Sequence, residues 1–130
     1  MLTVLVPLHT ALLVRDFDRA TQFYEAVLGL QRVPRSLKYN GAWYQIGHYQ
    51  IHLIEDPTLL ITHQHEAKWG RNPHVALGVA DVEAAIATLG QAGYPVQRSA
   101  SGRSACFTTD LDGNVIELTQ VESNPREFET

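Results

Sequence analysis

Four residues whose side chains bind metals recur at one spacing. His9 and His74 are 65 residues apart, and the same 65 residues separate His52 from Glu117. A single histidine in a strand is more often hydrogen-bonded or half-exposed than a ligand, so the prediction rests on the joint placement of all four. Imidazole nitrogens and a carboxylate oxygen bind Zn, Ni, Fe, Mn or Co, and no thiolate selects among these metals. The set therefore predicts one divalent transition metal whose identity stays open.

The segments around these residues form an internal repeat. HTALLVRD (9–16) and HVALGVAD (74–81) share His, Ala, Leu, Val and Asp in register, and IHL (51–53) falls on IEL (116–118). The segment at 9–14 belongs to a β-branched and aliphatic run that has the composition of a strand. The repeat predicts two β-α-β-β-β modules at about 3–55 and 74–121, joined by a connector at 56–73 and followed by a polar tail at 122–130.

Capping and turn residues set the expected elements of each module. Asp16 and Asp81 are expected to cap helices that end at Gly29 and Gly93. Asn40-Gly41 predicts a two-residue hairpin, and Gly47-His48 a second turn. Strands are expected at 3–14, 30–39, 42–46, 49–55, 74–80, 95–98, 104–109 and 115–121. We therefore predict an α+β fold in which the two modules form one curved eight-stranded half-barrel sheet with helices outside.

Size, charge and cysteine content narrow the class of protein. The chain has 130 residues, enough for one domain, and 45% of them are hydrophobic. A net charge of −4 gives no case for nucleic acid or an anionic membrane, so small solutes are the expected partners. The single cysteine, Cys106, excludes an intramolecular disulfide and suits the cytoplasm. The uncharged first fourteen residues are too short to span a bilayer and are predicted to form a buried strand.

These residues and motifs resemble the vicinal oxygen chelate superfamily, which includes glyoxalase I, bleomycin-resistance proteins, fosfomycin-resistance thiol transferases and extradiol dioxygenases. The resemblance covers 7–121, and FTTDLDGNVIELTQ is similar to the closing DPDGNxIEL signature, with Leu111 in place of the usual proline. It implies ligands on the first and last strands of each module, hence at His9, His52, His74 and Glu117. It also implies a homodimer, in which the site lies within one chain or spans two.

The resemblance implies a metal-dependent, glyoxalase-like lyase or isomerase that binds a small oxygen-rich substrate as a chelate on the metal. Glyoxalase I usually has glutamate where His52 stands, so Glu117 is expected to be both a ligand and the catalytic base. A small-molecule or drug binding and resistance protein of the same fold is one alternative. An extradiol-type dioxygenase is another, although a fourth ligand at His52 would occupy a position that this chemistry keeps open.

Three further residues are expected to line the substrate site. Trp43 and Phe107 lie on strands beside the ligand positions, although core packing is the default for aromatic side chains. Arg103 is expected either to bind an anionic substrate or to be a surface turn residue. The HQHE tract (63–66) is interpreted as a solvated connector, and Cys106 as buried and inert.

Overall fold

The computed structural model describes residues 1–122. The predicted polar tail at 122–130 thus lies outside the described residues, apart from Glu122. The described residues divide into two compact units, 1–57 and 58–122, and each is described by itself. In the part described, no helix is long and apolar enough to cross a membrane.

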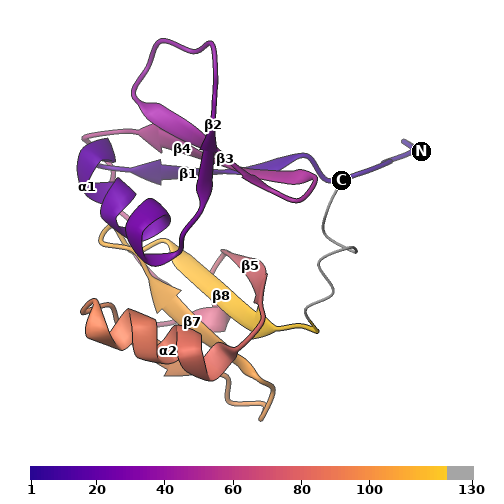
Figure 1. The fold of residues 1–130 in the computed structure, drawn as a ribbon, viewed down its shortest axis with the longest axis vertical. Coiled ribbons are helices and arrows are strands. Elements are labelled where there is room, and N and C mark those ends of the chain that lie inside the picture. Colours follow the sequence, from indigo (N-terminus) through magenta and orange to yellow (C-terminus); the bar gives the residue numbers. More distant parts are fainter. Residues whose placement is uncertain (123–130) are drawn as a thin grey trace. The chain divides into compact units, whose positions relative to one another are not determined.

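The first unit is a β-α-β-β-β module (Figure 1, indigo to magenta). Its strands form sheet A in the order β1-β4-β3-β2, with β1 parallel to β4 and the other pairs antiparallel. Its elements are β1 (His9–Val14), α1 (Phe17–Thr21), the π-helix η1 (Gln22–Val27), β2 (Gln31–Val33), β3 (Gly41–Ile46) and β4 (Tyr49–Glu55).

The second unit repeats this order in sheet B, whose strands run β5-β8-β7-β6 with β5 parallel to β8. In Figure 1, α2 lies along β7 and β8. Its elements are the 3₁₀ turn η2 (Trp69–Arg71), β5 (His74–Val79), α2 (Val82–Gln91), β6 (Val96–Arg98), β7 (Ala105–Thr109) and β8 (Val115–Gln120). The predicted α+β fold of two β-α-β-β-β modules is confirmed, with the strands hydrogen-bonded as two four-stranded sheets.

The helix boundaries follow the predicted caps. Asp16 accepts a hydrogen bond from the Arg19 backbone N–H at 3.1 Å, and Asp81 accepts one from that of Ala84 at 3.0 Å. Gly29 lies past the end of the first helix with a φ of 72°, a left-handed conformation that favours glycine. The first helix continues beyond Thr21 with π-helical hydrogen bonding, a local change that the apolar period does not reveal.

One face of each sheet forms the core beneath its helix. In unit 1, Tyr44, Ile51 and Leu53 from the sheet are buried, as are Phe23 and Tyr24 from η1. In unit 2 the core contains Cys106, Ile116 and Leu118 from the sheet and Val82 and Leu89 from α2. Because side chains alternate along a strand, the residues between these core positions lie on the opposite face, called here the open face of each sheet.

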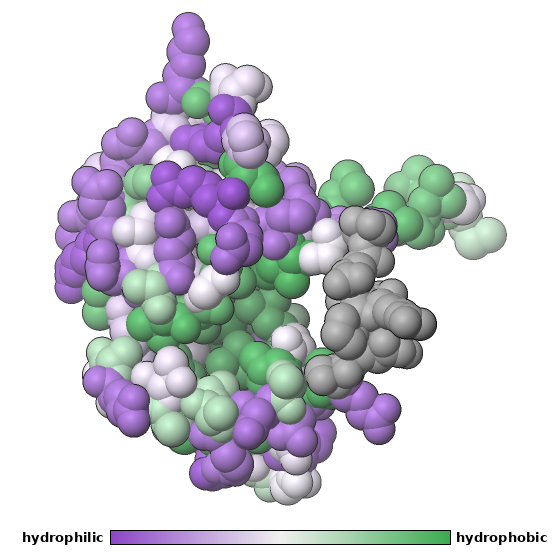
Figure 2. Space-filling view, in the orientation of Figure 1, coloured by the Kyte–Doolittle hydropathy of each residue, from purple (hydrophilic) through white to green (hydrophobic). Residues whose placement is uncertain are grey.

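The N-terminal strand is shorter than predicted. β1 begins at His9, and the six large apolar side chains between Met1 and Leu8 are exposed, which contradicts the predicted buried strand from residue 3. Figure 2 shows this segment as the group of apolar side chains at the right edge. The reason is pairing: His9 lies opposite Gln50, almost at the start of β4, so earlier residues have no strand beside them.

The connection between β2 and β3 also differs from the prediction. Asn40-Gly41 forms no two-residue hairpin, because β2 ends at Val33 and Gly41 is already the first residue of β3. A Cβ at Gly41 would overlap the carbonyl oxygen of Leu53, so this glycine permits a close approach of β3 to β4. The turn at Gly47-His48 is confirmed, with a φ of 57° at Gly47.

Candidate functional site

The open face of sheet A carries both predicted ligands of unit 1. The strand register sets Trp43 opposite His52, and His9 one row away beside Gln50. The His9 and His52 rings stack with centroids 4.0 Å apart and planes 10° apart. Trp43 stacks on the other side of His52, at 4.5 Å and 11°. The structure therefore brings these three side chains together as one continuous aromatic stack.

Two glutamine amides orient His52. Its Nε2 lies 2.8 Å from Gln50 Oε1, while the Gln50 amide nitrogen donates to Gln45 Oε1 at 2.7 Å. This network assigns the proton to His52 Nε2 and leaves the lone pair on Nδ1. Burial lowers the pKa of the His52 imidazole, and the neighbouring His9 and Arg35 lower that pKa further. A neutral imidazole is the form that binds a metal.

The open face of sheet B carries the other two predicted ligands. His74 begins β5, and its Nδ1 donates to the backbone oxygen of Asn72 at 2.7 Å, which leaves the lone pair on Nε2. Glu117 lies on the adjacent β8, and its Oε1 is 3.5 Å from His74 Nε2. Two donors about 2.1 Å from one tetrahedral ion are separated by about 3.4 Å, so this pair has the spacing of metal ligands.

Glu117 is held from two further sides. The Thr119 hydroxyl donates to Glu117 Oε2 at 2.6 Å, and the Arg103 guanidinium approaches Oε1 to 3.7 Å. Only 9% of Glu117 is exposed, whereas the Arg103 side chain is 54% exposed. The carboxylate of Glu117 thus has one hydroxyl donor and one cation beside it in a partly dry site.

Phe107 completes the open face of sheet B around these ligands. It lies opposite Glu117 on β7, and its ring meets His74 edge-on at 5.5 Å and 89°. A Cβ on Gly70 would come 2.5 Å from the Phe107 ring, so that glycine of η2 makes room for the aromatic side chain. Phe107 is therefore buried against the ligand pair rather than in the core beneath α2.

The donor sets fit a divalent metal in part. Each unit supplies two of the four predicted ligands, and within residues 1–122 no three His, Cys, Asp or Glu side chains gather closely enough to hold an ion. In unit 2 the donor spacing and the tautomer of His74 suit a metal directly. In unit 1, Nδ1 of His52 carries the lone pair while Gln50 holds Nε2. The four-residue site remains a prediction.

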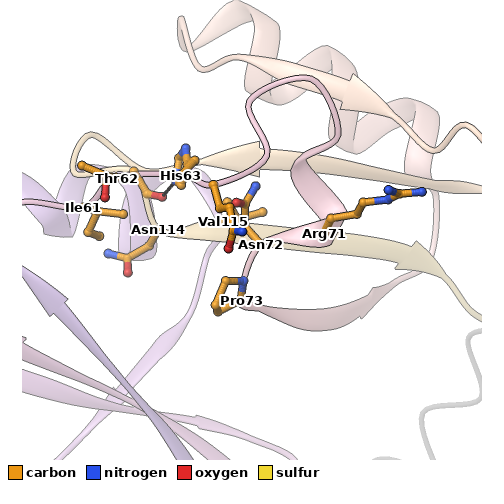
Figure 3. A pocket seen from close by; sticks show the side chains of 10 residues that line it. Ile61, Thr62, His63, Arg71, Asn72, Pro73, Asn114 and Val115 are labelled. Carbon is orange, nitrogen blue, oxygen red and sulfur yellow. Dashed lines mark hydrogen bonds between the residues drawn. The ribbon is translucent and has the colours of Figure 1, made fainter.

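The HQHE tract is partly solvated, with Gln64 and Glu66 exposed, but His63 and His65 have partners that the sequence does not reveal. His63 Nε2 lies 2.5 Å from the backbone oxygen of Gly113, and the buried Asn72 accepts from the His65 backbone N–H at 3.1 Å. A cavity of about 310 Å³ lies here, lined by residues 61–64, 71–73 and 113–115. Figure 3 shows His63, Thr62 and Asn114 close together, with Arg71 pointing away. None of the predicted site residues lines this cavity.

Several residues of the site escaped the sequence analysis. Gln45, Gln50 and Thr119 orient the predicted ligands, and Arg35 acts on His52 through its charge. Alternation could have revealed Gln50 and Thr119, since each lies two residues from a predicted ligand on the same strand. Gln45 and Arg35 can be assigned to the site only once the three-dimensional arrangement of β2, β3 and β4 is known.

Comparisons with known proteins agree with this architecture. The family model described as "Glyoxalase/Bleomycin resistance protein/Dioxygenase superfamily" matches residues 7–118. A lactoylglutathione lyase of Haemophilus influenzae is 30% identical over 128 residues, covering 89% of this chain and 93% of the relative.

Solved structures share the fold. The trypanothione-dependent glyoxalase I of Leishmania major is 26% identical with a TM-score of 0.66, covering 90% of this chain and 87% of that one. TnmS3, an antibiotic binding protein from Streptomyces sp. CB03234, is 22% identical with a TM-score of 0.65, covering 92% of this chain and 98% of that one. The second likeness, at this identity, concerns the fold alone.

Proposed function

The chain belongs to the Glyoxalase/Bleomycin resistance protein/Dioxygenase superfamily, and from this membership we propose that it is a metal-dependent, glyoxalase-like enzyme. Its substrate would be a small oxygen-rich molecule held on one divalent transition metal. The proposed ligands are His9, His52, His74 and Glu117. The proposed reaction is an isomerisation of the lyase type named for the relatives at about 30% identity.

One observation carries the proposal: His74 Nε2 and Glu117 Oε1 lie 3.5 Å apart on adjacent strands, with outer partners that orient both. A structural ion pair would not need the Nδ1 of His74 fixed by a backbone oxygen. Metal-binding histidines have this arrangement almost always, because it sets the tautomer and the direction of the ring.

The chemistry follows from the charge on Glu117. A hemithioacetal of a thiol and a 2-oxoaldehyde is an isomer of a 2-hydroxy thioester. The conversion moves one proton from carbon to the neighbouring carbon and one proton from the hydroxyl oxygen to the former ketone oxygen. A bound divalent metal supplies Lewis-acid stabilisation of the negative charge that develops on the substrate oxygens. Glu117 takes the proton and returns it to the adjacent carbon. The Thr119 hydroxyl holds the Oε2 atom of Glu117 in place meanwhile.

Trp43, Phe107 and Arg103 complete the proposed site. The faces of Trp43 and Phe107 would exclude water from the substrate. Arg103, 3.7 Å from Glu117 and largely exposed, would bind an anionic group of the substrate at the edge of the site. When a metal neutralises Glu117, the guanidinium is free for this role.

Metal analysis and turnover of the tag-free protein test the proposal. We expect about one equivalent of transition metal after purification or titration, and conversion of the methylglyoxal–glutathione hemithioacetal to its thioester. Glu117→Gln removes the charge and keeps the shape, so turnover should fall by at least about a hundredfold. Glu83→Gln is the matched control, because its exposed carboxylate pairs with Arg98 away from the ligands.

Two results would overturn the enzyme assignment. Less than about a tenth of an equivalent of metal, with no binding on titration, would exclude the metal site. Turnover that is equal in Glu117→Gln and Glu83→Gln would exclude Glu117 as the base. His52→Ala tests the proposed ligand of unit 1 and should weaken metal binding. Its control is His48→Ala, which removes an exposed turn histidine and should leave metal binding unchanged.

A binding or resistance protein is the second candidate, and the aromatic stack of Trp43, His52 and His9 favours it. Parallel rings form a wall on which a flat drug-like molecule can stack. In that case, Trp43→Ala would abolish protection of cells against such a compound, while His74→Ala and Glu117→Gln would leave the protection intact. The enzyme requires the opposite dependence.

The proposal includes a homodimer in the cytoplasm, with small molecules as the partners. Sedimentation velocity of the full chain at several concentrations distinguishes a dimer from a monomer. If modules are exchanged, mixing inactive His9→Ala and inactive Glu117→Gln proteins, with partial unfolding and refolding, should restore some sites. No recovery of turnover in such a mixture would argue for sites within single chains.

A further inference from the structure

Arg35 has a buried nitrogen that the protein leaves unpaired. Among the described residues, its Nη1 is the one buried side-chain nitrogen or oxygen without a hydrogen-bond partner. A buried donor without a partner has lost its water and gained nothing in return, and for a charged group this cost is large. Orphaned donors of this kind in native structures call for an explanation, and a ligand absent from the structure is one.

The rest of the guanidinium is held firmly. Nη2 donates to the backbone oxygen of Tyr39, and Cζ lies 4.9 Å from the centre of the Tyr39 ring. A Cβ at Gly41 would be 3.5 Å from Nη2, so the guanidinium lies within van der Waals distance of the start of β3. One end of the fork is thus fixed, and the other end is left with free N–H groups.

The guanidinium belongs to the same face as the predicted ligands of unit 1. Val33 of β2 lies opposite Trp43, which lies opposite His52. Gly41 lies two residues before Trp43 on β3, so a Cβ at Gly41 would be on the same side of sheet A as Trp43, and that position is 3.5 Å from Arg35 Nη2. The positions of Gly41 and Trp43 along β3 are about 7 Å apart, a distance that one small planar molecule can span.

We propose that Arg35 is an anion-recognition residue on the open face of sheet A, where its Nη1 binds the carboxylate of a small planar molecule that stacks on Trp43. Charge-assisted hydrogen bonds between guanidinium and carboxylate are among the strongest in proteins. The Trp43 ring, parallel to His52, supplies the flat apolar wall beside it. Tyr39 covers the guanidinium but is 47% exposed, and rotation of its side chain opens the way to Nη1.

This inference deepens the proposed function and rests on it in one respect, since the open face is taken as the substrate side. It names a substrate class, a small molecule with a carboxylate beside a planar group. It also assigns Arg35 a role different from that of Arg103, which lies in unit 2 beside Glu117.

Benzoate and its neutral isostere benzamide are suitable probes, titrated into the full chain by calorimetry or by ligand-observed NMR. We expect benzoate to bind about tenfold more tightly than benzamide, the preference that one charge-assisted hydrogen bond supplies. Arg35→Met keeps the aliphatic length, removes the orphaned donor and should abolish the preference. Arg35→Lys keeps a point charge and should retain part of it.

Lys38→Met is the matched control, because it removes one exposed positive charge from the same connection between β2 and β3. Its preference for benzoate should equal that of the wild type. Equal binding of the two probes, no binding of either, or a preference that survives Arg35→Met would each overturn the inference. A cooperative thermal unfolding transition in both Arg35→Met and Lys38→Met verifies that each variant folds.

The proposed function fails or stands on a different measurement, namely metal content and thioester formation. If the protein binds no metal and has no turnover, but Arg35→Met removes its preference for benzoate, the anion site is supported and the proposed enzyme activity is excluded. If the protein has turnover and Arg35→Met leaves the preference for benzoate unchanged, the enzyme activity is supported and the anion site is excluded.

Discussion

His74 Nε2 and Glu117 Oε1 lie 3.5 Å apart on the neighbouring strands β5 and β8, each held from behind by a separate hydrogen bond. The Asn72 backbone oxygen accepts from His74, and the Thr119 hydroxyl donates to Glu117. The pair therefore keeps its direction without a ligand. Because the outer partners fix the direction of the proposed ligands, substitutions of these partners should also change metal binding.

Removal of the Thr119 hydroxyl should weaken metal binding. Thr119→Val preserves the shape of the side chain and deletes the 2.6 Å hydrogen bond to Glu117 Oε2. Because outer partners of metal ligands tune affinity by about 10–100-fold, we expect a Zn²⁺ affinity lower by about that factor. Competition with a chromophoric chelator measures it. Thr88→Val, which alters a helix hydroxyl bonded to Ala84, should leave the affinity unchanged; equal affinities in the two variants would contradict the role of Thr119.

A side chain at Gly70 should disturb Phe107. In Gly70→Ala the new Cβ would come 2.5 Å from the Phe107 ring, so the ring must move away from its contact with His74. Overpacking of this kind costs about 1–3 kcal/mol of unfolding free energy, measurable by urea titration. Gly90→Ala is the control, because a Cβ there meets nothing within 4 Å and lies inside α2. We expect it to stabilise the protein by about 0.5–1 kcal/mol, and a Gly70→Ala protein as stable as this control would refute the steric account.

The cluster of Glu25, Arg32 and Tyr44 should make stability depend on pH. Burial alone would raise the pKa of Glu25, but hydrogen bonds from Arg32 and Tyr44 outweigh it and lower that pKa below the 4.5 of an unperturbed glutamate. A carboxyl whose pKa is lowered by folding stabilises the native state above pH 4.5. This contribution is lost as the pH falls through the folded pKa.

Glu25→Gln should therefore lower the unfolding free energy by about 1 kcal/mol at pH 7, a value that allows for the partial exposure of the pair. The difference from the wild type should be smaller at about pH 3 than at pH 7, because a larger fraction of the wild-type carboxyl is protonated at the lower pH. Urea titrations at both pH values measure it, with the exposed Glu66→Gln as control. A difference that is the same at both pH values would show that charge is not its source.

Cys106 should be unreactive in the folded protein. Its thiol is fully buried in β7, and burial raises its pKa above the 9.0 of a free thiol. Only the thiolate attacks disulfide reagents, so modification requires opening of unit 2. We expect the reaction with Ellman's reagent to be at least about a thousandfold slower in buffer than in concentrated urea. Rapid modification of the native protein would mean that β7 opens locally.

Local signals in the sequence account for most of the elements. The caps at Asp16 and Asp81, the left-handed glycines Gly29 and Gly93, and strand β4 are found where the sequence predicts them. These features depend on residues within one turn or one strand, where side-chain and backbone chemistry act at short range. The repeat likewise identified the two modules.

Other predictions failed because they depend on pairing. Residues 3–8 have strand composition but no strand beside them, and Gly41 has hairpin chemistry but lies within β3. Strand propensity reflects packing against neighbours more than an intrinsic preference of the backbone. Composition alone therefore extended β1 too far and placed the turn wrongly. The hydrogen bonds of His63 with Gly113 and of His65 with Asn72 likewise depend on residues outside the HQHE tract.

The sequence by itself determined the types of the four predicted ligands and, through alternation, the strand faces on which they lie. Only the tertiary structure decided that Trp43 stacks on His52, that Glu117 contacts Arg103 and Thr119, and that Arg35 keeps an unpaired nitrogen. The physical reason is register: which side chains meet across a sheet depends on the alignment of strands distant in the chain, and no local pattern encodes that alignment.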